Sequence, residues 1–161
     1  MIKSVAAWNR DCTTFAICGY SYRVKHEDIT RDIIGASMAI LNELKPGLDE
    51  KLYENALVIE LTARGHLVEH QRRFPVFYKG HHIGTLTPDL IVDGRVIADA
   101  KVVSGFNESH VAQMLGYLNI TGLEVAILVN FKEIKLQWKR ILNDRAQLVA
   151  NDANEWPLDP L

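Results

Sequence analysis

Residues 88–101 read PDLIVDGRVIADAK and decide the fold of this chain. Two apolar runs rich in Val and Ile flank Asp93-Gly94, a dipeptide typical of the turn in a β-hairpin. The hairpin places Asp89 on one strand and Asp99 and Lys101 on the next. Carboxylates are hard ligands suited to Mg²⁺ or Mn²⁺, and a lysine can stabilise developing negative charge. The segment therefore indicates metal-dependent cleavage of phosphodiester bonds.

The turn decides whether these charged side chains share one face of the sheet. A two-residue turn puts Asp89 and Asp99 on opposite faces, because side chains alternate along a strand. A three-residue loop with Gly94 in the left-handed conformation puts Asp89 opposite Ile97, on the same face as Asp99 and Lys101. The functional interpretation therefore predicts an extra residue or a bulge in this turn.

Helical and strand-like segments surround the hairpin. Apolar residues at helical spacing predict helices over residues 30–44, 49–64 and 107–121. Runs rich in β-branched and aromatic residues predict strands over residues 67–78, 83–92, 95–103, 125–129 and 136–142. The order is α-α-β-β-β-α-β-β, which predicts an α/β fold with a mixed sheet flanked by helices.

Several details of these elements follow from particular residues. We expect Thr30 to cap the first helix, and Gly65 to end the second. The predicted buried stripe of the second helix is Leu52, Ala56, Ile59 and Ala63. The predicted apolar face of the third helix is Val111, Met114, Leu115 and Leu118. The uninterrupted apolar run 125–129 indicates a strand covered on both faces and reached through a crossover helix.

The composition is that of one globular domain with a sizeable core. The chain has 161 residues, of which 48% are hydrophobic and 24% are charged. We expect a poorly specified arm over residues 1–25, a folded domain over residues 26–143 and a tail over residues 144–161. The net charge of −2 excludes a global basic field that would drive tight non-specific binding to nucleic acid, but permits a local positive groove.

The two cysteines and the absence of long apolar runs bear on location. Cys12 and Cys18 match no standard zinc spacing and form no disulfide framework, which favours a reducing cytoplasm. No apolar run is long enough for a signal-peptide core or a membrane span. We therefore expect a cytoplasmic protein with no membrane partner.

Three sets of residues together carry a family resemblance. Residues 47–53, GLDEKLY, fit the signature G-x-x-E-x-x-Y. Residues 88–89 and 99–101 fit P-D and (D/E)-x-K, and residues 113–117, QMLGY, fit Q-x-x-x-Y. Over residues 26–143 the chain resembles the GxxExxY proteins, a branch of the PD-(D/E)XK nuclease superfamily. The resemblance implies a restriction-endonuclease-like core around one metal site.

The resemblance also implies a set of ligands for Mg²⁺ or Mn²⁺. Asp89 would bind or bridge the metal, Asp99 would be the second acidic ligand, and the backbone carbonyl of Ala100 would be a third. Glu50 matches the signature glutamate and would complete the acidic cluster. Glu54, one turn later on the same helical face, is the less favoured substitute. A helix-dipole role is the simpler interpretation of Glu50 outside the resemblance.

The remaining site candidates are polar side chains around these ligands. By the resemblance, Lys101 would orient or activate the attacking water. Gln113 and Tyr117 share a helical face opposite the apolar stripe, so they are candidates to face the site or a nucleic-acid strand. Tyr53 and Tyr117 are also interpreted as core residues with a hydrogen-bonding tip, and Gln113 as a partner for a buried backbone group.

Histidines and basic residues elsewhere in the chain have simpler interpretations. His66 and His70 have the spacing of a zinc pair on a helix, but Gly65 ends the predicted helix before them. Two basic groups are candidates for phosphate contact: Arg72, Arg73 and Lys79, and then Lys135, Lys139 and Arg140. Solvated strand faces are the simpler interpretation of both groups.

The hypothesis from the sequence is a Mg²⁺- or Mn²⁺-dependent nuclease that hydrolyses phosphodiester bonds in DNA through attack of a water activated by the metal. The alternative is a catalytically inactive module on a nuclease fold that binds nucleic acid or protein. A third possibility is an interaction module with no role in nucleic acid. The complete set of Asp89, Asp99, Lys101 and Glu50 favours the enzyme.

Overall fold

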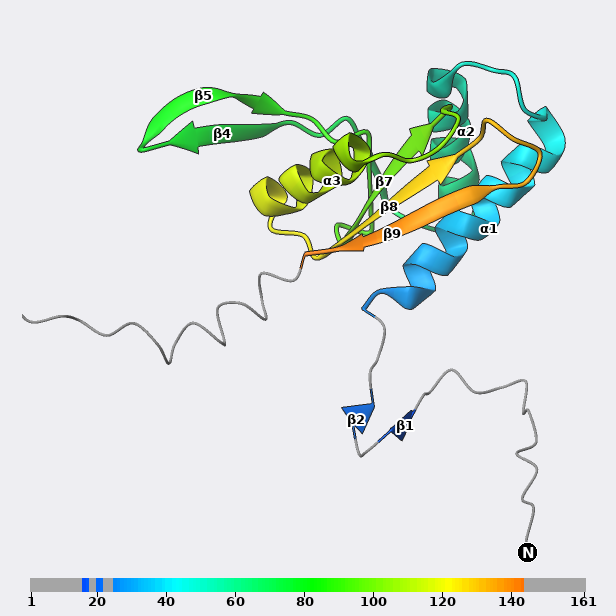
Figure 1. Cartoon of the computed structure of the whole chain (residues 1–161), viewed down its shortest axis with the longest axis horizontal. Coiled ribbons are helices and arrows are strands. Elements are labelled where there is room, and N and C mark those ends of the chain that lie inside the picture. The colour runs from blue at the N-terminus through cyan, green and yellow to red at the C-terminus, as the bar shows by residue number, and fades with distance from the viewer. Residues whose placement is uncertain (1–15, 18–19, 22–24, 144–161) are drawn as a thin grey trace, which may run out of the picture.

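The structure of the protein is a computed structural model that describes residues 16–17, 20–21 and 25–143 (Figure 1). The predicted tail, residues 144–161, and most of the predicted arm, residues 1–25, lie outside the described residues. The helices of the described part are α1 (Glu27–Leu44), α2 (Glu50–Ala63) and α3 (Glu108–Thr121). Its strands are β1 (Ala16–Ile17), β2 (Tyr20–Ser21), β3 (Val68–His70), β4 (Phe74–Tyr78), β5 (His81–Leu86), β6 (Leu90–Val92), β7 (Val96–Lys101), β8 (Val125–Asn130) and β9 (Gln137–Leu142).

A mixed five-stranded sheet in the order β3-β6-β7-β8-β9 forms the centre of the fold. Strands β7 and β8 are parallel and are connected through α3, whereas the other neighbours in this sheet are antiparallel. One face of the sheet packs against α1 and α2, and the other packs against α3. The predicted α/β class, the flanking helices, the crossover helix and the edge strand β9 are all confirmed. None of the described helices is long and apolar enough to cross a membrane.

The strands predicted over residues 67–78 and 83–92 are each divided into two shorter strands, so these two predictions are wrong in this respect. Residues 71–73 separate β3 from β4, and residues 87–89 separate β5 from β6. Strands β4 and β5 pair only with each other and form a hairpin that projects from the body (Figure 1). The division has a backbone cause: Gln71 has a φ of 54°, and Pro88 has no N–H to donate to a strand neighbour.

The predicted buried stripe of α2 is also wrong. The buried residues of α2 are Tyr53, Glu54, Leu57 and Leu61. Ile59, predicted to be buried, is 71% exposed, and Leu52 is exposed as well. Apolar residues lie on more than one side of this helix, so packing against α1 and the sheet, rather than periodicity, selects the buried side.

Helix ends follow the predictions with one exception. Helix α2 is followed by Gly65 in a left-handed conformation, and α3 by Gly122 in the same conformation. Helix α1 begins at Glu27, so the prediction that Thr30 is its cap is wrong. The hydroxyl of Thr30 instead donates to the carbonyls of His26 and Glu27, inside the first turn. In α3 the predicted face is correct for Met114 and Leu118, which are buried, and wrong for Leu115, which is exposed.

Tyr53 holds the loop that leads into α2. Its side chain is fully buried and stacks on Phe131, with ring centroids 4.5 Å apart and an interplanar angle of 5°. The hydroxyl donates to the carbonyl of Lys45 at 2.6 Å and accepts from the backbone N–H of Leu48 at 3.2 Å. These contacts fix the path of the chain immediately before Glu50, the first residue of the helix.

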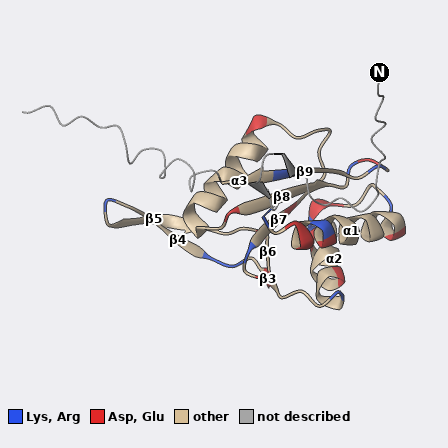
Figure 2. Ribbon diagram, turned by 90° about the horizontal axis from the view of Figure 1, so that it is seen from below, with Lys and Arg blue, Asp and Glu red and all other residues tan. Residues whose placement is uncertain are grey.

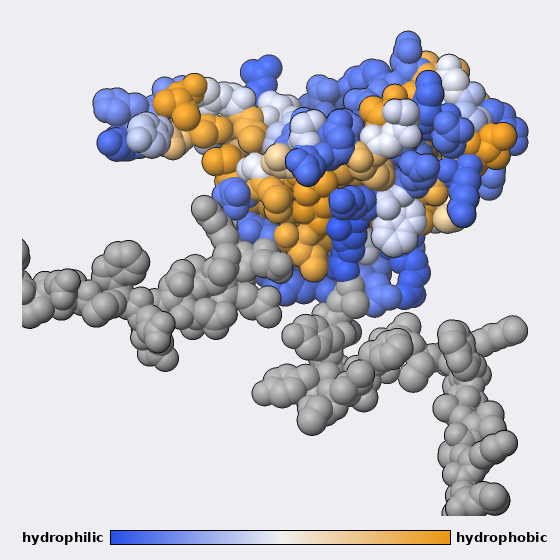
Figure 3. Space-filling view, in the orientation of Figure 1, coloured by the Kyte–Doolittle hydropathy of each residue, from blue (hydrophilic) through white to orange (hydrophobic). Residues whose placement is uncertain are grey.

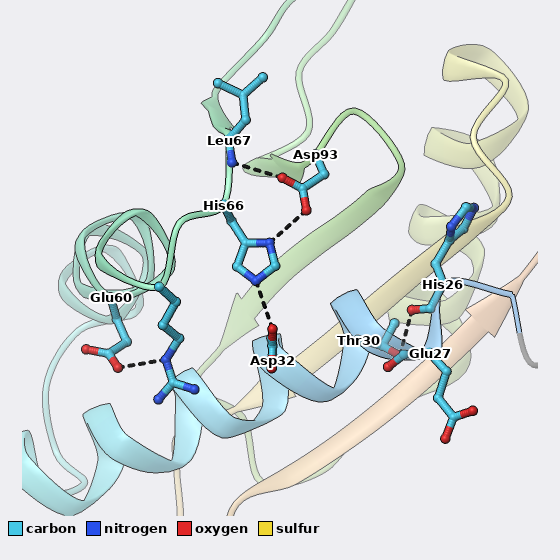
Figure 4. A network of polar contacts seen from close by, with 9 residues as sticks. His26, Glu27, Thr30, Asp32, Glu60, His66, Leu67 and Asp93 are labelled. Carbon is cyan, nitrogen blue, oxygen red and sulfur yellow. Dashed lines mark hydrogen bonds and ion pairs between the residues drawn. The ribbon is translucent and has the colours of Figure 1, made fainter. Parts of the chain in front are cut away.

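His66 joins three separate elements at the other end of the sheet (Figure 4). Its Nδ1 lies 2.7 Å from Asp93 Oδ2, and its Nε2 lies 3.1 Å from Asp32 Oδ2. Asp93 also accepts from the backbone N–H of Leu67 at 2.9 Å. The network therefore links α1, the start of β3 and the turn between β6 and β7. His66 lies outside any helix, and His70 contacts Glu54 instead.

Both partners of this ion pair have shifted pKa values. The hydrogen bond with Asp93 is the main cause of a raised pKa for His66, and Asp32 adds to it. Burial opposes ionisation of Asp93, but its bonds with His66 and the Leu67 N–H outweigh burial and lower its pKa. The network is therefore an ion pair in weakly acidic solution.

We expect Tyr53→Phe to lower the free energy of unfolding by about 1–3 kcal/mol, because it removes two hydrogen bonds and leaves the ring stack intact. Urea denaturation followed by circular dichroism measures this difference. Tyr78→Phe, at a tyrosine that is 63% exposed, is the matched control and should change the free energy by less than about 0.5 kcal/mol. Equal stability of the two variants would contradict a structural role for the Tyr53 hydroxyl.

We expect His66→Asn to destabilise the protein most in weakly acidic solution. The pKa of His66 is higher in the folded protein than its unfolded value of 6.5. The stability that His66 contributes is therefore complete below pH 6.5 and is lost as the pH rises through the pKa of the folded state. The stability that Asp93 contributes is present above its unfolded pKa of 3.8 and is lost as the pH falls through its lower pKa in the folded protein. The expected loss is therefore greatest between these values, about 1–3 kcal/mol, and smaller at alkaline pH.

Urea denaturation at several pH values, with exposed His81→Asn as the control, tests this expectation. A pH-independent difference between His66→Asn and the wild type would exclude the ion pair as its cause.

Candidate active site

The end of β7 carries two of the predicted site residues. Every residue of β7 is buried, and alternate side chains point to opposite faces of the sheet. Ala98 packs with α1 and α2, whereas Ile97 packs with α3. Asp99 and Lys101 are two and four residues after Ile97 on the same strand, so their side chains lie on the α3 face as well. The Lys101 Nζ lies 2.6 Å from Asp99 Oδ1, and both side chains are almost inaccessible to solvent.

The turn between β6 and β7 contains the extra residue that the functional interpretation requires. Asp93 and Gly94 both have positive φ, 52° and 64°, and the N–H of Arg95 donates to the carbonyl of Val92. The register pairs Val92 with Val96, so residues 93–95 form a three-residue loop. The predicted pairing of β6 with β7 is wrong by two positions. The prediction puts Asp89 opposite Ile97, whereas the observed pairing of Leu90 with Ala98, continued by one residue, puts Asp89 opposite Asp99.

Asp89 lies at the point where β6 begins. Its carbonyl accepts from the backbone N–H of Gln71 at 2.9 Å, which continues the ladder between β3 and β6 by one bond. Burial is the main cause of a raised pKa for the Asp89 carboxyl, and the nearby charge of Glu54 adds to it. Lys101 acts in the opposite direction and lowers this pKa. Asp89 therefore lies within electrostatic reach of both acidic and basic groups.

Asp99 is a buried carboxylate that lacks hydrogen-bond partners. It is 1% exposed, and neither of its oxygens accepts a hydrogen bond within the described part of the chain. The Lys101 Nζ forms an ion pair with Asp99 Oδ1 at 2.6 Å, so Oδ2 is the oxygen that has no partner within the described residues. Burial raises the pKa of Asp99 to about 6 despite the opposing effect of Lys101, and Asp89 and Glu50 raise it further. A buried carboxylate with one open oxygen is suited to receive a cation.

Glu50 and Glu54 occupy different environments although they lie on one helix. Glu50 reaches the end of β7: its Oε2 accepts from the N–H of Val102 at 3.3 Å, and its Oε1 lies 3.7 Å from Lys101 Nζ. The side chain of Glu50 is 43% exposed, so it remains open to a ligand. Glu54 is 7% exposed, with Lys51 and His70 against its Oε1. The Glu54 carboxylate is therefore already engaged by side chains of the protein, whereas the Glu50 carboxylate is more accessible to a ligand.

Helix α3 brings Tyr117 and Gln113 to the same region. The amide of Gln113 donates to the Tyr117 hydroxyl at 3.0 Å. Burial raises the pKa of the Tyr117 hydroxyl, and the charges of Asp89 and Asp99 raise it further. Tyr117 therefore faces the acidic groups as a neutral phenol, whereas Gln113 lies exposed beside it.

Asn130 is a site-supporting residue that sequence reasoning missed. It ends β8 directly beside Lys101 and is almost fully buried. Its amide donates to the carbonyl of Val103 at 2.7 Å, and its Oδ1 accepts from the Val103 N–H at 3.1 Å. Asn130 therefore fixes the chain just after Lys101. The available signal was one polar residue at the end of the apolar run 125–129.

The oxygen donors of this region suit a hard divalent cation, but they do not form a closed cage. Within residues 25–143 and the short described segments before them, no three Asp, Glu, His or Cys side chains form a group that could hold a metal ion. Asp99 supplies an open buried oxygen, and among its acidic neighbours Asp89 raises the pKa of Asp99 more than Glu50 does. Mg²⁺ is commonly held by one or two carboxylates while it keeps several waters, so this donor set fits it.

Comparison with solved structures finds similar chains of low sequence identity. An alkaline exonuclease from Laribacter hongkongensis is 12% identical, with 81% of this chain and 77% of that chain covered and a TM-score of 0.46. A structure of that exonuclease in complex with dAMP has a TM-score of 0.42 at 12% identity, over 73% of this chain and 81% of that chain. The structure of SSO0001 is 17% identical, with 81% and 67% covered and a TM-score of 0.48.

No curated protein matches the chain. The family model of the PD-(D/E)XK nuclease superfamily matches residues 27–141, a span that runs from the first residue of α1 into β9 and contains every candidate site residue. The chain therefore belongs to the PD-(D/E)XK nuclease superfamily.

Proposed function

We propose that the protein is a divalent-metal-dependent nuclease that hydrolyses phosphodiester bonds in DNA. The observation that carries this proposal is the buried Asp99 carboxylate, whose Oδ1 pairs with Lys101 and whose Oδ2 has no partner within the described residues. The Lys101 ammonium offsets part of the cost of burying this carboxylate, and a divalent cation at the oxygen without a partner would offset more of it. Membership of a nuclease superfamily supports the same conclusion.

The ligands that we propose for Mg²⁺ or Mn²⁺ are the carboxylates of Asp89 and Asp99 and the backbone carbonyl of Ala100, the residue that directly follows Asp99. Glu50 completes the acidic group from the first turn of α2, and its exposed carboxylate can hold a water of the metal. When bound, the metal supplies an activated water and offsets negative charge on the phosphoryl group.

Lys101 acts as a cation in this proposal. Burial alone would lower its pKa, but its contact with Asp99 and the charge of Glu50 outweigh burial and raise it. A lysine that stays protonated cannot take a proton from water. Its ammonium therefore orients the attacking water or stabilises charge on the phosphate oxygens.

Tyr117 and Gln113 are proposed to contact the substrate. A neutral phenol is a hydrogen-bond donor, and Tyr117 faces the acidic group from α3, on the side of the sheet where Asp99 lies. Gln113 orients this hydroxyl and is exposed enough to meet a nucleic-acid strand.

We further propose that the chain belongs to the GxxExxY branch of the superfamily. Each signature position has a physical role in the structure. Gly47 has a φ of 116°, which favours glycine, and Tyr53 holds the loop from Lys45 to Leu48. Glu50 then starts α2 at the end of β7. The signature therefore positions the glutamate, and Tyr53 supports the site rather than touching substrate.

We expect Asp99→Asn and Lys101→Ala each to reduce cleavage of labelled DNA by about 100-fold or more, because each removes a group that acts on charge in the transition state. Cleavage is measured with Mg²⁺, with Mn²⁺ and with a chelator, on single- and double-stranded DNA and on RNA. Asp28→Asn, an exposed acid on α1, is the control and should leave cleavage unchanged.

Cleavage that survives Lys101→Ala or the chelator would reject the proposed site. A wild-type protein that binds DNA without cutting it would identify the alternative of an inactive binding module.

We expect Mn²⁺ to raise the unfolding temperature of the wild type and not that of Asp89→Asn. A ligand at about 100 times its dissociation constant adds about 2.7 kcal/mol to stability. Asp99 has a pKa of about 6 without metal, so protons compete with the metal below that value and the shift should grow from acidic to alkaline pH. Differential scanning fluorimetry measures the shift, and an equal shift in both proteins would place the metal elsewhere.

A further inference from the structure

The β4–β5 hairpin and the segment that leads into it carry three basic residues, of which Arg72 pairs with Glu69. Residues 70–88 contain Arg72, Arg73 and Lys79 but no Asp or Glu, in a chain whose net charge is −2. Figure 2 shows blue at the tip of the hairpin and on its connection from β3, and no red on β4 or β5. The hairpin is therefore a local basic surface on a weakly acidic protein.

Large apolar side chains are exposed on the same hairpin. Phe77, Tyr78 and Ile83 all lie mostly in solvent. Orange side chains stand among blue ones on the projecting hairpin in Figure 3. Only the base of the hairpin is anchored, by Phe74, which packs with the core under α3. Large apolar groups that are exposed on one projecting element mark an interaction site more often than an idle surface.

The tip presents aromatic rings beside cations. Lys79 and Gly80 both have positive φ, as a tight hairpin turn requires. The Nζ of Lys79 lies 5.5 Å from the centre of the Tyr78 ring. Phe77 lies edge-on to His82, its partner across the hairpin. At the base, Arg72 lies over the Phe74 ring and pairs with Glu69, whereas Arg73 is exposed.

The base of the hairpin is next to the candidate active site. Arg72 and Arg73 directly follow Gln71, whose backbone N–H donates to the carbonyl of Asp89. Strand β5 returns the chain to Asp89 with only residues 87–88 between them. A strand of nucleic acid lying along the hairpin would therefore lead directly to the acidic groups.

We infer that the β4–β5 hairpin is a binding platform for single-stranded DNA that leads the strand into the active site. Arg73 and Lys79 contact phosphates, and Tyr78 and Phe77 stack on unpaired bases. A duplex hides the faces of its bases, so the exposed rings favour a single strand. This inference rests on the proposed nuclease function and specifies its substrate.

Binding of a fluorescein-labelled oligothymidine of about 20 nucleotides to the full chain, with chelator to prevent cleavage, tests the inference by fluorescence anisotropy. We expect Arg73→Gln with Lys79→Gln to weaken binding about tenfold at low salt. The slope of log Kd against log salt should fall by about 1.4, since each phosphate contact contributes about 0.7 on single strands. Arg31→Gln with Arg95→Gln changes the charge equally on exposed residues of α1 and the β6–β7 turn, and should have little effect.

Stacking is tested separately at Tyr78. We expect Tyr78→Ala to weaken binding of the oligothymidine about tenfold and to affect a duplex of equal length much less. Tyr78→Phe keeps the ring and should bind as the wild type does, which distinguishes stacking from a general loss of the hairpin. An equal effect of Tyr78→Ala on single strand and duplex would overturn the single-strand assignment.

Three further outcomes would overturn the inference itself. The first is that the wild type does not bind the oligothymidine. The second is that Arg73→Gln with Lys79→Gln binds it as well as Arg31→Gln with Arg95→Gln does. The third is that the wild type is a dimer which Tyr78→Ala dissociates without changing DNA binding. The last outcome, seen by light scattering, would make the hairpin a protein interface. Because binding is measured without cleavage, a protein that binds through the hairpin but does not cut refutes the nuclease proposal alone. Cutting that depends on Asp99 but not on the hairpin variants refutes the platform alone.

Discussion

The rest of the structure depends on one constraint. The charged side chains of Asp99 and Lys101 are buried at the end of a strand that is covered on both faces. A charge in such a place costs on the order of several kcal/mol unless it is paired. The ion pair offsets part of this cost, and Glu50 adds a second carboxylate near Lys101. The apolar layers under α2 and α3 hold the pair at the edge of the core, so the site has a rigid base and an open end.

One irregularity beside Asp89 shapes both the site and the projecting hairpin. The left-handed Gln71 and the missing N–H of Pro88 end the pairing of β3 with β6. The same break releases the chain as β4 and β5, which carry basic and aromatic side chains away from the core. A longer, unbroken meander would leave Asp89 inside a strand and bury the rings that now stand in solvent. The position of Asp89 and the projection of the hairpin thus share a structural origin.

Much of the fold could be predicted from the chain because its strongest patterns are local. The apolar run of β8, the turn at Asp93 and the glycine ends of α2 and α3 each depend on neighbours in sequence. The buried side of α2 could not be predicted, since the stack of Tyr53 on Phe131 joins residues far apart in the chain. The strand breaks were missed for a similar reason: β-propensity continues through residues 71–73, and only pairing decides where a strand ends.

The sequence by itself determined which residues are candidates for the site: Asp89, Asp99, Lys101, Glu50 and the Gln113–Tyr117 pair were all recognisable from residue type and spacing. Tertiary structure alone decided their states. Burial raises the pKa of Asp99, and one of its oxygens pairs with Lys101 while the other has no partner within the described residues. The position of α2 leaves the Glu50 carboxylate exposed, whereas Glu54 is buried against Lys51 and His70. These properties depend on desolvation and on contacts between distant segments, which no local pattern encodes.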